Sequence, residues 1–170
     1  MLDRLGQLAG GAAVGAPTEP TISEKLPQQS YNVKLSGKDI TAPHIQLSHG
    51  RKEMRGRVFD AVTVLSFKED KVTGNIGGGA VNVKAWKEGD TLKAEGGFGG
   101  SPAEVTYSPK ELTVYLRSCT YRLKSAEEPG TYVGRRSCDR VFERDTVVQL
   151  PEALKELSPA EQAAVLLLSL

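Results

Sequence analysis

Cys119 and Cys138 are the residues with the clearest chemistry in the sequence. They flank a predicted β-hairpin whose turn centres at Glu128-Pro129, and both lie equally far from that centre. A symmetric hairpin therefore places the two cysteines directly opposite each other, where a disulfide can form. A bridge across this loop stabilises a fold by about 3 kcal/mol. It predicts a periplasmic or extracellular location, whereas two free thiols would indicate the cytoplasm.

The remaining residue types give weaker chemical signals. His44 and His49 are five apart, so a continuous strand points them to opposite faces and does not favour a shared metal. Neither cysteine has an evident histidine partner for nucleophilic catalysis. The glycine-rich stretch from Gly74 to Gly100 lacks the lysine-serine ending of a phosphate-binding loop. We interpret its glycines as barrel corners, bulges and tight hairpins, and we predict no catalytic residue, no metal and no cofactor.

Arginine is concentrated towards the C-terminal part of the chain. Residues 117–144 contain seven Lys or Arg and four Asp or Glu. Strand arginines can pair bidentately with carboxylates, so Arg135, Arg136 and Arg140 are the predicted surface for a protein partner. The overall charge of +1 does not favour nucleic-acid binding.

Aromatic residues offer a second binding hypothesis. Trp86, Phe98 and Tyr107 are candidates for the lining of a ligand cavity. The alternative for each of them is ordinary core packing or pairing across neighbouring strands.

The elements that must position these residues are β-strands. Between residues 30 and 150, apolar and polar residues alternate and turn signals recur, which predicts an antiparallel β-sandwich or a small β-barrel. Residues 57–67 read as one central strand. The apolar face changes side near Arg117-Ser118, where we expect a β-bulge. A weak repeat relates residues 74–78 to residues 96–100, as expected for two copies of a strand pair.

The two ends of the chain differ from this β-domain. Residues 1–29 show no periodic apolar stripe and are interpreted as a leader or flexible linker, with a weak secretory signal as a variant. Residues 151–170 change to a helical period. Ser158, Pro159 and Glu161 are typical of a capped helix start, which predicts a helix from about Pro159 to Leu168 packed on or near the β-domain. No apolar run reaches the roughly 18 residues of a membrane-spanning helix.

These features favour three functions to different degrees. The composition of the 170 residues, 39% hydrophobic and 25% charged, is that of a folded domain. The first hypothesis is a non-enzymatic binding or structural module of a bacterial-type cell envelope that engages a protein partner. The second is a small-ligand carrier with a cavity beneath Trp86 and Phe98. The third, a hydrolase with carboxylates distant in the sequence, has no support from spacing.

Overall fold

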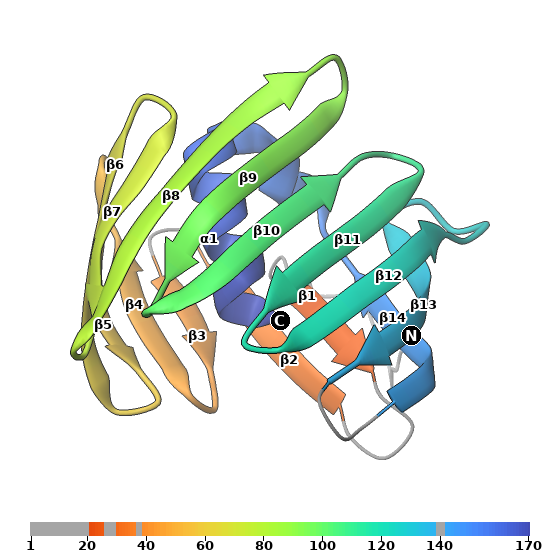
Figure 1. Cartoon of the computed structure of the whole chain (residues 1–170), viewed down its shortest axis with the longest axis horizontal. Helices are drawn as coiled ribbons and strands as arrows, with labels where there is room; N and C mark the ends of the chain where they lie inside the picture. The colour runs from red at the N-terminus through yellow and green to blue at the C-terminus, as the bar shows by residue number, and fades with distance from the viewer. Residues whose placement is uncertain (1–20, 26–29, 37–38, 139–141) are drawn as a thin grey trace.

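The protein is a closed barrel of 14 antiparallel strands (Figure 1). The computed structural model describes residues 21–25, 30–36, 39–138 and 142–170. Each strand pairs with its neighbours in the sequence, and the first strand pairs with the last to close the ring. The predicted mainly β class is confirmed, and the barrel is the architecture found. Among the described strands, closure leaves no edge unpaired, which removes the usual site of edge-to-edge aggregation.

The elements follow one another along the chain without a crossover. Their bounds are β1 Thr21–Lys25, β2 Ser30–Ser36, β3 Asp39–Ala42, β4 Ile45–His49, β5 Glu53–Val58, β6 Ala61–Lys68, β7 Lys71–Ile76, β8 Gly79–Glu88, β9 Thr91–Phe98, β10 Ser101–Tyr107, β11 Glu111–Leu116, β12 Cys119–Ser125, β13 Thr131–Ser137, β14 Phe142–Gln149, the 3₁₀ helix η2 Glu152–Glu156 and α1 Pro159–Ser169. Side chains alternate between the buried interior and the outer face, as the period of two predicted.

Strand β1 lies within the segment that was interpreted as a leader or linker, so that interpretation is wrong for residues 21–25. The strand pairs with β2 on one side and β14 on the other. Its inward residues are Ile22 and Glu24, which are 1% and 4% exposed. A buried carboxylate at the second inward position hides the apolar alternation by which a strand is normally recognised.

Two hairpin turns replace features that were predicted differently. Residues 57–67 do not form one strand, because the chain reverses at Phe59-Asp60 between β5 and β6. A turn at Arg117-Ser118 likewise takes the place of the expected bulge and separates β11 from β12. All four turn residues have positive φ, at 50° and 63° in the first turn and 53° and 65° in the second. Two-residue hairpins need this conformation, for which glycine or asparagine is the usual choice.

The repeated glycine segments occupy equivalent places in the barrel. Gly74 lies in β7 and Gly96 in β9, with φ of +143° and +149°. A Cβ atom at these positions would overlap the carbonyl oxygen of Val64 or Asn82 on the neighbouring strand. Glycine is therefore required at both positions, which agrees with the interpretation of the repeat as two strand pairs.

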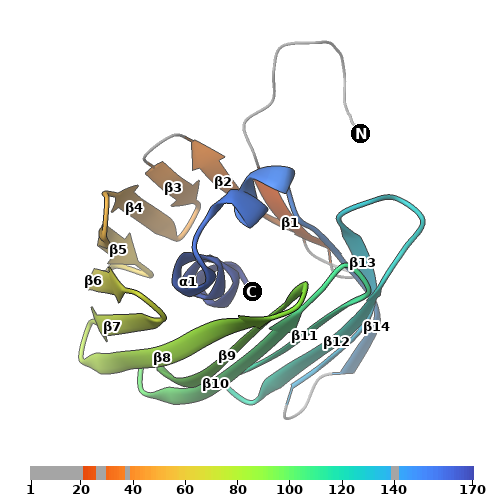
Figure 2. The ribbon, with the colours of Figure 1, turned by 90° about the horizontal axis from the view of Figure 1, so that it is seen from above.

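Helix α1 lies inside the barrel (Figure 2). It is buried on every side from Gln162 to Ser169, and it packs against the wall formed by β6 to β10. The sequence predicted a helix on or near the β-domain, and the structure places it in the lumen. Side chains alone fill a barrel of about eight strands. A barrel of 14 strands is wider, and a helix that is apolar all round fills the remaining space.

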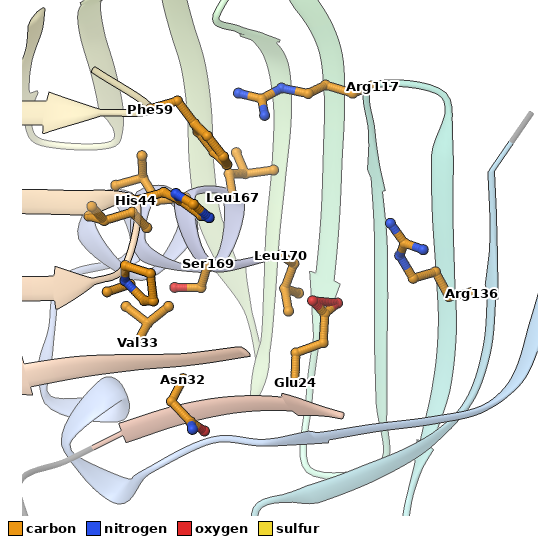
Figure 3. Close-up of a pocket in the computed structure, with 14 residues that line it drawn as sticks. Glu24, Asn32, Val33, His44, Phe59, Arg117, Arg136, Leu167, Ser169 and Leu170 are labelled. Carbon is orange, nitrogen blue, oxygen red and sulfur yellow. The ribbon is translucent and has the colours of Figure 1, made fainter. Parts of the chain in front are cut away.

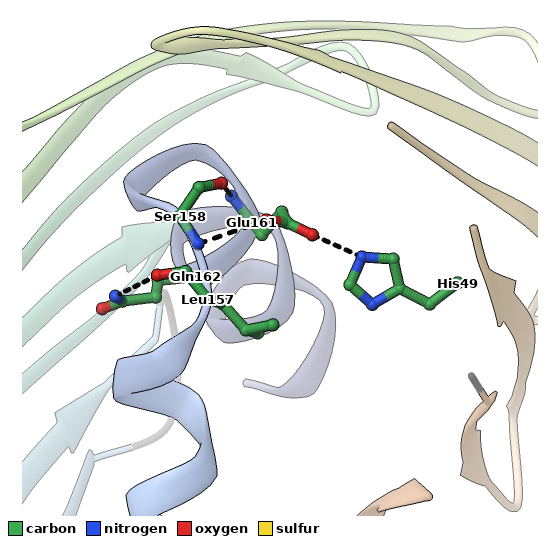
Figure 4. Close-up of polar contacts among 5 residues, drawn as sticks. All are labelled: His49, Leu157, Ser158, Glu161 and Gln162. Carbon is green, nitrogen blue, oxygen red and sulfur yellow. Dashed lines mark hydrogen bonds and ion pairs between the residues drawn. The ribbon is translucent and has the colours of Figure 1, made fainter. Parts of the chain in front are cut away.

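The start of α1 is fixed by a capping box, as predicted (Figure 4). Glu161 N donates to Ser158 Oγ, and Ser158 N donates to Glu161 Oε1, both at 3.2 Å. A hydrogen bond of 2.5 Å joins the other carboxylate oxygen of Glu161 to His49 Nε2. Because His49 ends strand β4, this contact ties the start of the helix to the barrel wall.

The Glu161 contacts predict a dependence of stability on pH. Burial by itself would raise the pKa of Glu161, but hydrogen bonds from Ser158 and His49 outweigh burial and lower it. A carboxyl with a lowered pKa in the folded state stabilises the fold above its unfolded pKa of about 4.3. That contribution is lost as the pH falls through the folded-state pKa. We expect Glu161→Gln to lower the free energy of unfolding by about 0.5–1 kcal/mol at pH 7 and by less at pH 3.

Urea unfolding measured from pH 7 to pH 3 tests this expectation. Glu156→Gln is the matched control, since Glu156 is exposed and precedes the helix. A constant difference between the Glu161 variant and the native protein over the whole range would contradict it.

Candidate functional site

A cavity of about 250 Å³ lies at the end of the barrel where α1 ends (Figure 3). It is bounded by the last turn of the helix and by residues from β1 to β4, with contributions from two hairpin turns and β13. Leucine side chains of the helix form its apolar part together with apolar residues of the wall, among them Val33 and Ile45. The polar lining residues are Glu24, Asn32, His44, Arg117, Arg136 and Ser169. This mixture of an apolar surface and a few polar groups is typical of sites for small ligands.

Phe59 stands at the mouth of the cavity and is 60% exposed. Its ring stacks on His44, with centroids 4.9 Å apart and an interplanar angle of 14°. The backbone N–H of Phe59 donates to the His44 carbonyl at 2.8 Å, which fixes the turn against the β3–β4 connection. An aromatic residue with φ of +50° is unusual and costs backbone energy. Such strained residues are concentrated at functional sites.

Arg117 reaches the cavity from the turn between β11 and β12 (Figure 3). It is exposed, and it has neither an ion pair nor a hydrogen bond with the residues that the structure describes. The neighbouring Cys119 begins β12, so the disulfide holds this turn close to β13. The guanidinium is therefore presented at the rim with its donors available to a ligand.

A buried polar network forms the side of the cavity nearest β12 and β13. Tyr121 is 1% exposed and its hydroxyl donates to Glu24 Oε2 at 2.5 Å. Arg136 Nε donates to the same hydroxyl at 3.0 Å, and the backbone oxygen of Leu170 lies at the same distance. Burial is the main cause that raises the pKa of Tyr121, Glu24 adds to the increase and Arg136 opposes it. The hydroxyl thus stays protonated and links the two charged groups.

Tyr121→Phe tests this network. The variant removes one hydrogen bond to a carboxylate that is 4% exposed. A hydrogen bond to a charged group contributes about 1.5–3 kcal/mol, so we expect the free energy of unfolding to fall by that amount. Urea unfolding gives the value. Tyr115→Phe, at a side chain 39% exposed, is the matched control and should change stability little. Equal effects of the two substitutions would contradict the role of the Tyr121 hydroxyl.

The predicted disulfide is confirmed. Cys119 and Cys138 are bonded, with Cα atoms 4.0 Å apart, and Thr120 faces Ser137 in the adjacent register position. This is the symmetric register expected from the sequence. The bridge lies beside the cavity, since Arg136 Nη2 is 3.8 Å from Cys119 Sγ. The pair is compatible with an oxidising location, extracellular or periplasmic.

The arginines of the predicted partner surface do not lie together. Arg135 and Arg136 are consecutive in β13, so their side chains leave the strand on opposite faces. Arg136 lines the cavity, whereas Arg135 is exposed on the outer face, directly opposite Arg122 of β12. Arg140 lies outside the described residues.

The predicted ligand-lining aromatics lie elsewhere. Phe98 and Tyr107 are 0% and 5% exposed and belong to the core, and Tyr107 packs edge-on against Tyr132. Trp86 follows the buried Ala85 and is therefore on the outer side of β8, where it is half-buried. None of the three predicted aromatics lines the cavity described above.

His44 lies in the turn before β4 and His49 ends that strand, so the two do not belong to one continuous strand, and of the two only His44 reaches the cavity. The site residues Glu24, Phe59 and Tyr121 were not predicted from the sequence. Their role depends on turn conformations and on closure of the barrel, which spacing alone does not reveal.

Further observations bear on the chemistry of the chain. Among the described residues, no group of three or more His, Cys, Asp or Glu is placed to hold a metal ion. No helix in the described ranges is long and apolar enough to cross a membrane. Comparisons with protein-family models, with curated proteins and with solved structures give no match. The functional proposal therefore rests on the geometry of the cavity.

Proposed function

We propose that the protein is a non-enzymatic binding protein of the periplasm or the extracellular space, and that a small amphipathic molecule binds in the cavity at the end of α1. The observation that carries this proposal is the cavity itself, which remains beside a helix that otherwise fills the barrel. Closed barrels commonly hold small ligands at one end of the lumen. The disulfide supports the oxidising location.

The polar contacts at the cavity favour binding over catalysis. Tyr121 connects Glu24 to Arg136, and Phe59 stacks on His44. A hydrolytic site needs a nucleophile with an adjacent base, or two carboxylates facing one position. The hydrogen bonds of Tyr121 with Glu24 and Arg136 instead stabilise the wall and leave a shaped surface for a ligand.

Titration with 4-phenylbutanol, a neutral amphipathic probe, tests the binding function. In ¹H–¹⁵N correlation spectra we expect saturable shifts of the backbone amides of Leu167, Leu168 and Leu170. Ala42→Trp would fill the cavity from β3 and abolish these shifts. The matched control is Ala126→Trp. Ala126 lies in the loop that follows the C-terminal end of β12. Absence of binding, or equal binding by the Ala42→Trp variant, would refute the proposal.

A second candidate is docking of an acidic protein partner on the outer face of β12 and β13. Arg122 and Arg135 face each other directly there, and neither makes an ion pair with a described residue. Like charges directly opposite each other cost energy, which a carboxylate from a partner would relieve. The test is a pull-down that compares the partners recovered by the Arg122→Gln/Arg135→Gln variant with those recovered by a control variant, Lys68→Gln/Lys71→Gln. The control also removes two opposed exposed cations. Recovery of the same partners by both variants would exclude this surface.

A further inference from the structure

We infer that the ligand of the cavity is an organic anion that also carries a flat ring, with the anionic group beside Arg117 and Arg136 and the ring beneath Phe59. This inference rests on the proposed binding function and adds the chemical class of the ligand. It comes from the charge of the lining residues, the position of the exposed aromatic ring and the conformation of the two turns that carry them.

The exposed guanidinium at the rim of the cavity favours an anion. Two guanidinium groups line the cavity together with the carboxylate of Glu24 and the backbone carboxyl oxygen of Leu170, and both of these oxygens accept a hydrogen bond from the Tyr121 hydroxyl. The carboxylate of Glu24 is 4% exposed and accepts a hydrogen bond from the Tyr121 hydroxyl, so the network already engages its charge. Arg117 is at the rim and exposed. A planar guanidinium matches the two oxygens of a carboxylate, which it can bind bidentately. Arg136 adds positive potential while it holds Tyr121.

The aromatic side of the cavity favours a ring. Phe59 is 60% exposed, and its stacking on His44 fixes its orientation over the mouth. Leu167 of the helix lines the same cavity, is 2% exposed and contributes to its apolar surface. A flat ring between these groups would gain offset stacking and apolar burial. A linear chain would gain only the burial.

Two strained turns present the principal groups of this site. Phe59-Asp60 and Arg117-Ser118 have φ between 50° and 65° at all four residues, where glycine or asparagine would cost less backbone energy. The first residue of each turn, Phe59 or Arg117, contributes its side chain to the lining of the same cavity. In Figure 3, Phe59 and His44 lie on one side of the cavity, and Arg117 and Arg136 approach from the β11 to β13 side. The arrangement therefore separates a ring-binding half from an anion-binding half.

Four probes separate the contributions of charge and ring. They are 4-phenylbutyrate, 4-phenylbutanol, 4-phenylbutylamine and hexanoate, each titrated by ¹H–¹⁵N correlation spectra at low ionic strength. We expect 4-phenylbutyrate to bind about tenfold more tightly than 4-phenylbutanol, which corresponds to one charge-assisted contact. The amine should bind least. Hexanoate, which lacks the ring, should bind more weakly than 4-phenylbutyrate.

Variants assign these preferences to residues. Arg117→Gln should bring the affinity for 4-phenylbutyrate close to that for 4-phenylbutanol, while Arg117→Lys should retain part of the preference. Phe59→Gly should remove the difference in affinity between 4-phenylbutyrate and hexanoate. The substitution also relieves the strain of the turn, so we expect the fold to tolerate it. Arg122→Gln removes the same charge from the outer face and should have no effect.

The outcomes distinguish this inference from the function on which it rests. Equal binding of 4-phenylbutyrate and 4-phenylbutanol by the native protein would overturn the anionic class and leave the binding function intact. Equal losses in the Arg117→Gln and Arg122→Gln variants would show that the preference comes from overall charge, and would overturn the assignment to Arg117. Failure of every probe to shift the cavity amides would overturn both proposals.

Discussion

Leu166→Ala is expected to lower the free energy of unfolding by about 2–5 kcal/mol. Leu166 is 0% exposed and lies on α1, inside the closed ring of strands. Each strand of the barrel is hydrogen-bonded on both sides, so the wall cannot move inward to fill the space left by the side chain. The full cost of the cavity is therefore added to the loss of apolar burial. Urea unfolding followed by circular dichroism measures the change.

Leu157→Ala is the matched control for this substitution. Leu157 precedes the helix and is only partly buried, so the same change of side chain should cost clearly less. Equal losses at the two positions would contradict the placement of α1 in the lumen. A helix that packed on the outside of the barrel would leave one face exposed, and substitutions on that face would then be tolerated.

Replacement of both cysteines by serine should lower the free energy of unfolding by about 3 kcal/mol. The two residues are 19 apart in the sequence, and the cross-link reduces the freedom of the unfolded chain over that loop. Mass spectrometry under non-reducing conditions should find the native protein lighter than its reduced form by the mass of two hydrogen atoms. Urea unfolding with and without reductant gives the energetic effect.

The Cys119→Ser/Cys138→Ser variant provides its own control. A reductant should destabilise the native protein to the level of the double variant and have no effect on the variant itself. Two alkylatable thiols in the protein isolated from its own compartment would contradict the bridge, and would also move the proposed location to the cytoplasm.

The features that were predictable from the sequence depend on contacts between near neighbours. Alternation at Val81, Val83 and Ala85 identifies β8, and the symmetric spacing of the cysteines identifies their pairing across one hairpin. The capping box at Ser158 and Glu161 likewise involves residues three apart. In each case a local pattern is sufficient, because the interacting residues belong to one strand, one hairpin or one helical turn.

The site was not predictable because its residues meet only when distant elements assemble. The Phe59-Asp60 and Arg117-Ser118 turns lack the glycine or asparagine by which hairpins are recognised, so both turns were missed. The same two turns carry groups that define the mouth of the cavity. Because these strained turns do not contain the residues typical of hairpins, the sequence carries no local signal for the site.

The position of the helix was hidden for a different reason. The helical period of residues 151–170, with Ala163 and Leu166 on one face, predicted a helix packed on or near the β-domain. The other faces carry Ala164, Val165 and Leu168, which are buried as well. An apolar residue on every face indicates a helix enclosed by protein. What encloses it depends on the number of strands in the ring, and the two missed turns obscured that number.

The order of elements along the chain has a consequence for folding during synthesis. The ring closes only when β14 pairs with β1, and α1 follows β14 in the chain. A growing chain that has reached β13 can form local hairpins, but it presents unpaired strands at both edges and an empty apolar interior. Completion of the structure therefore waits for the last elements to be synthesised. Until then the exposed strand edges and apolar surface of the growing chain are prone to aggregation.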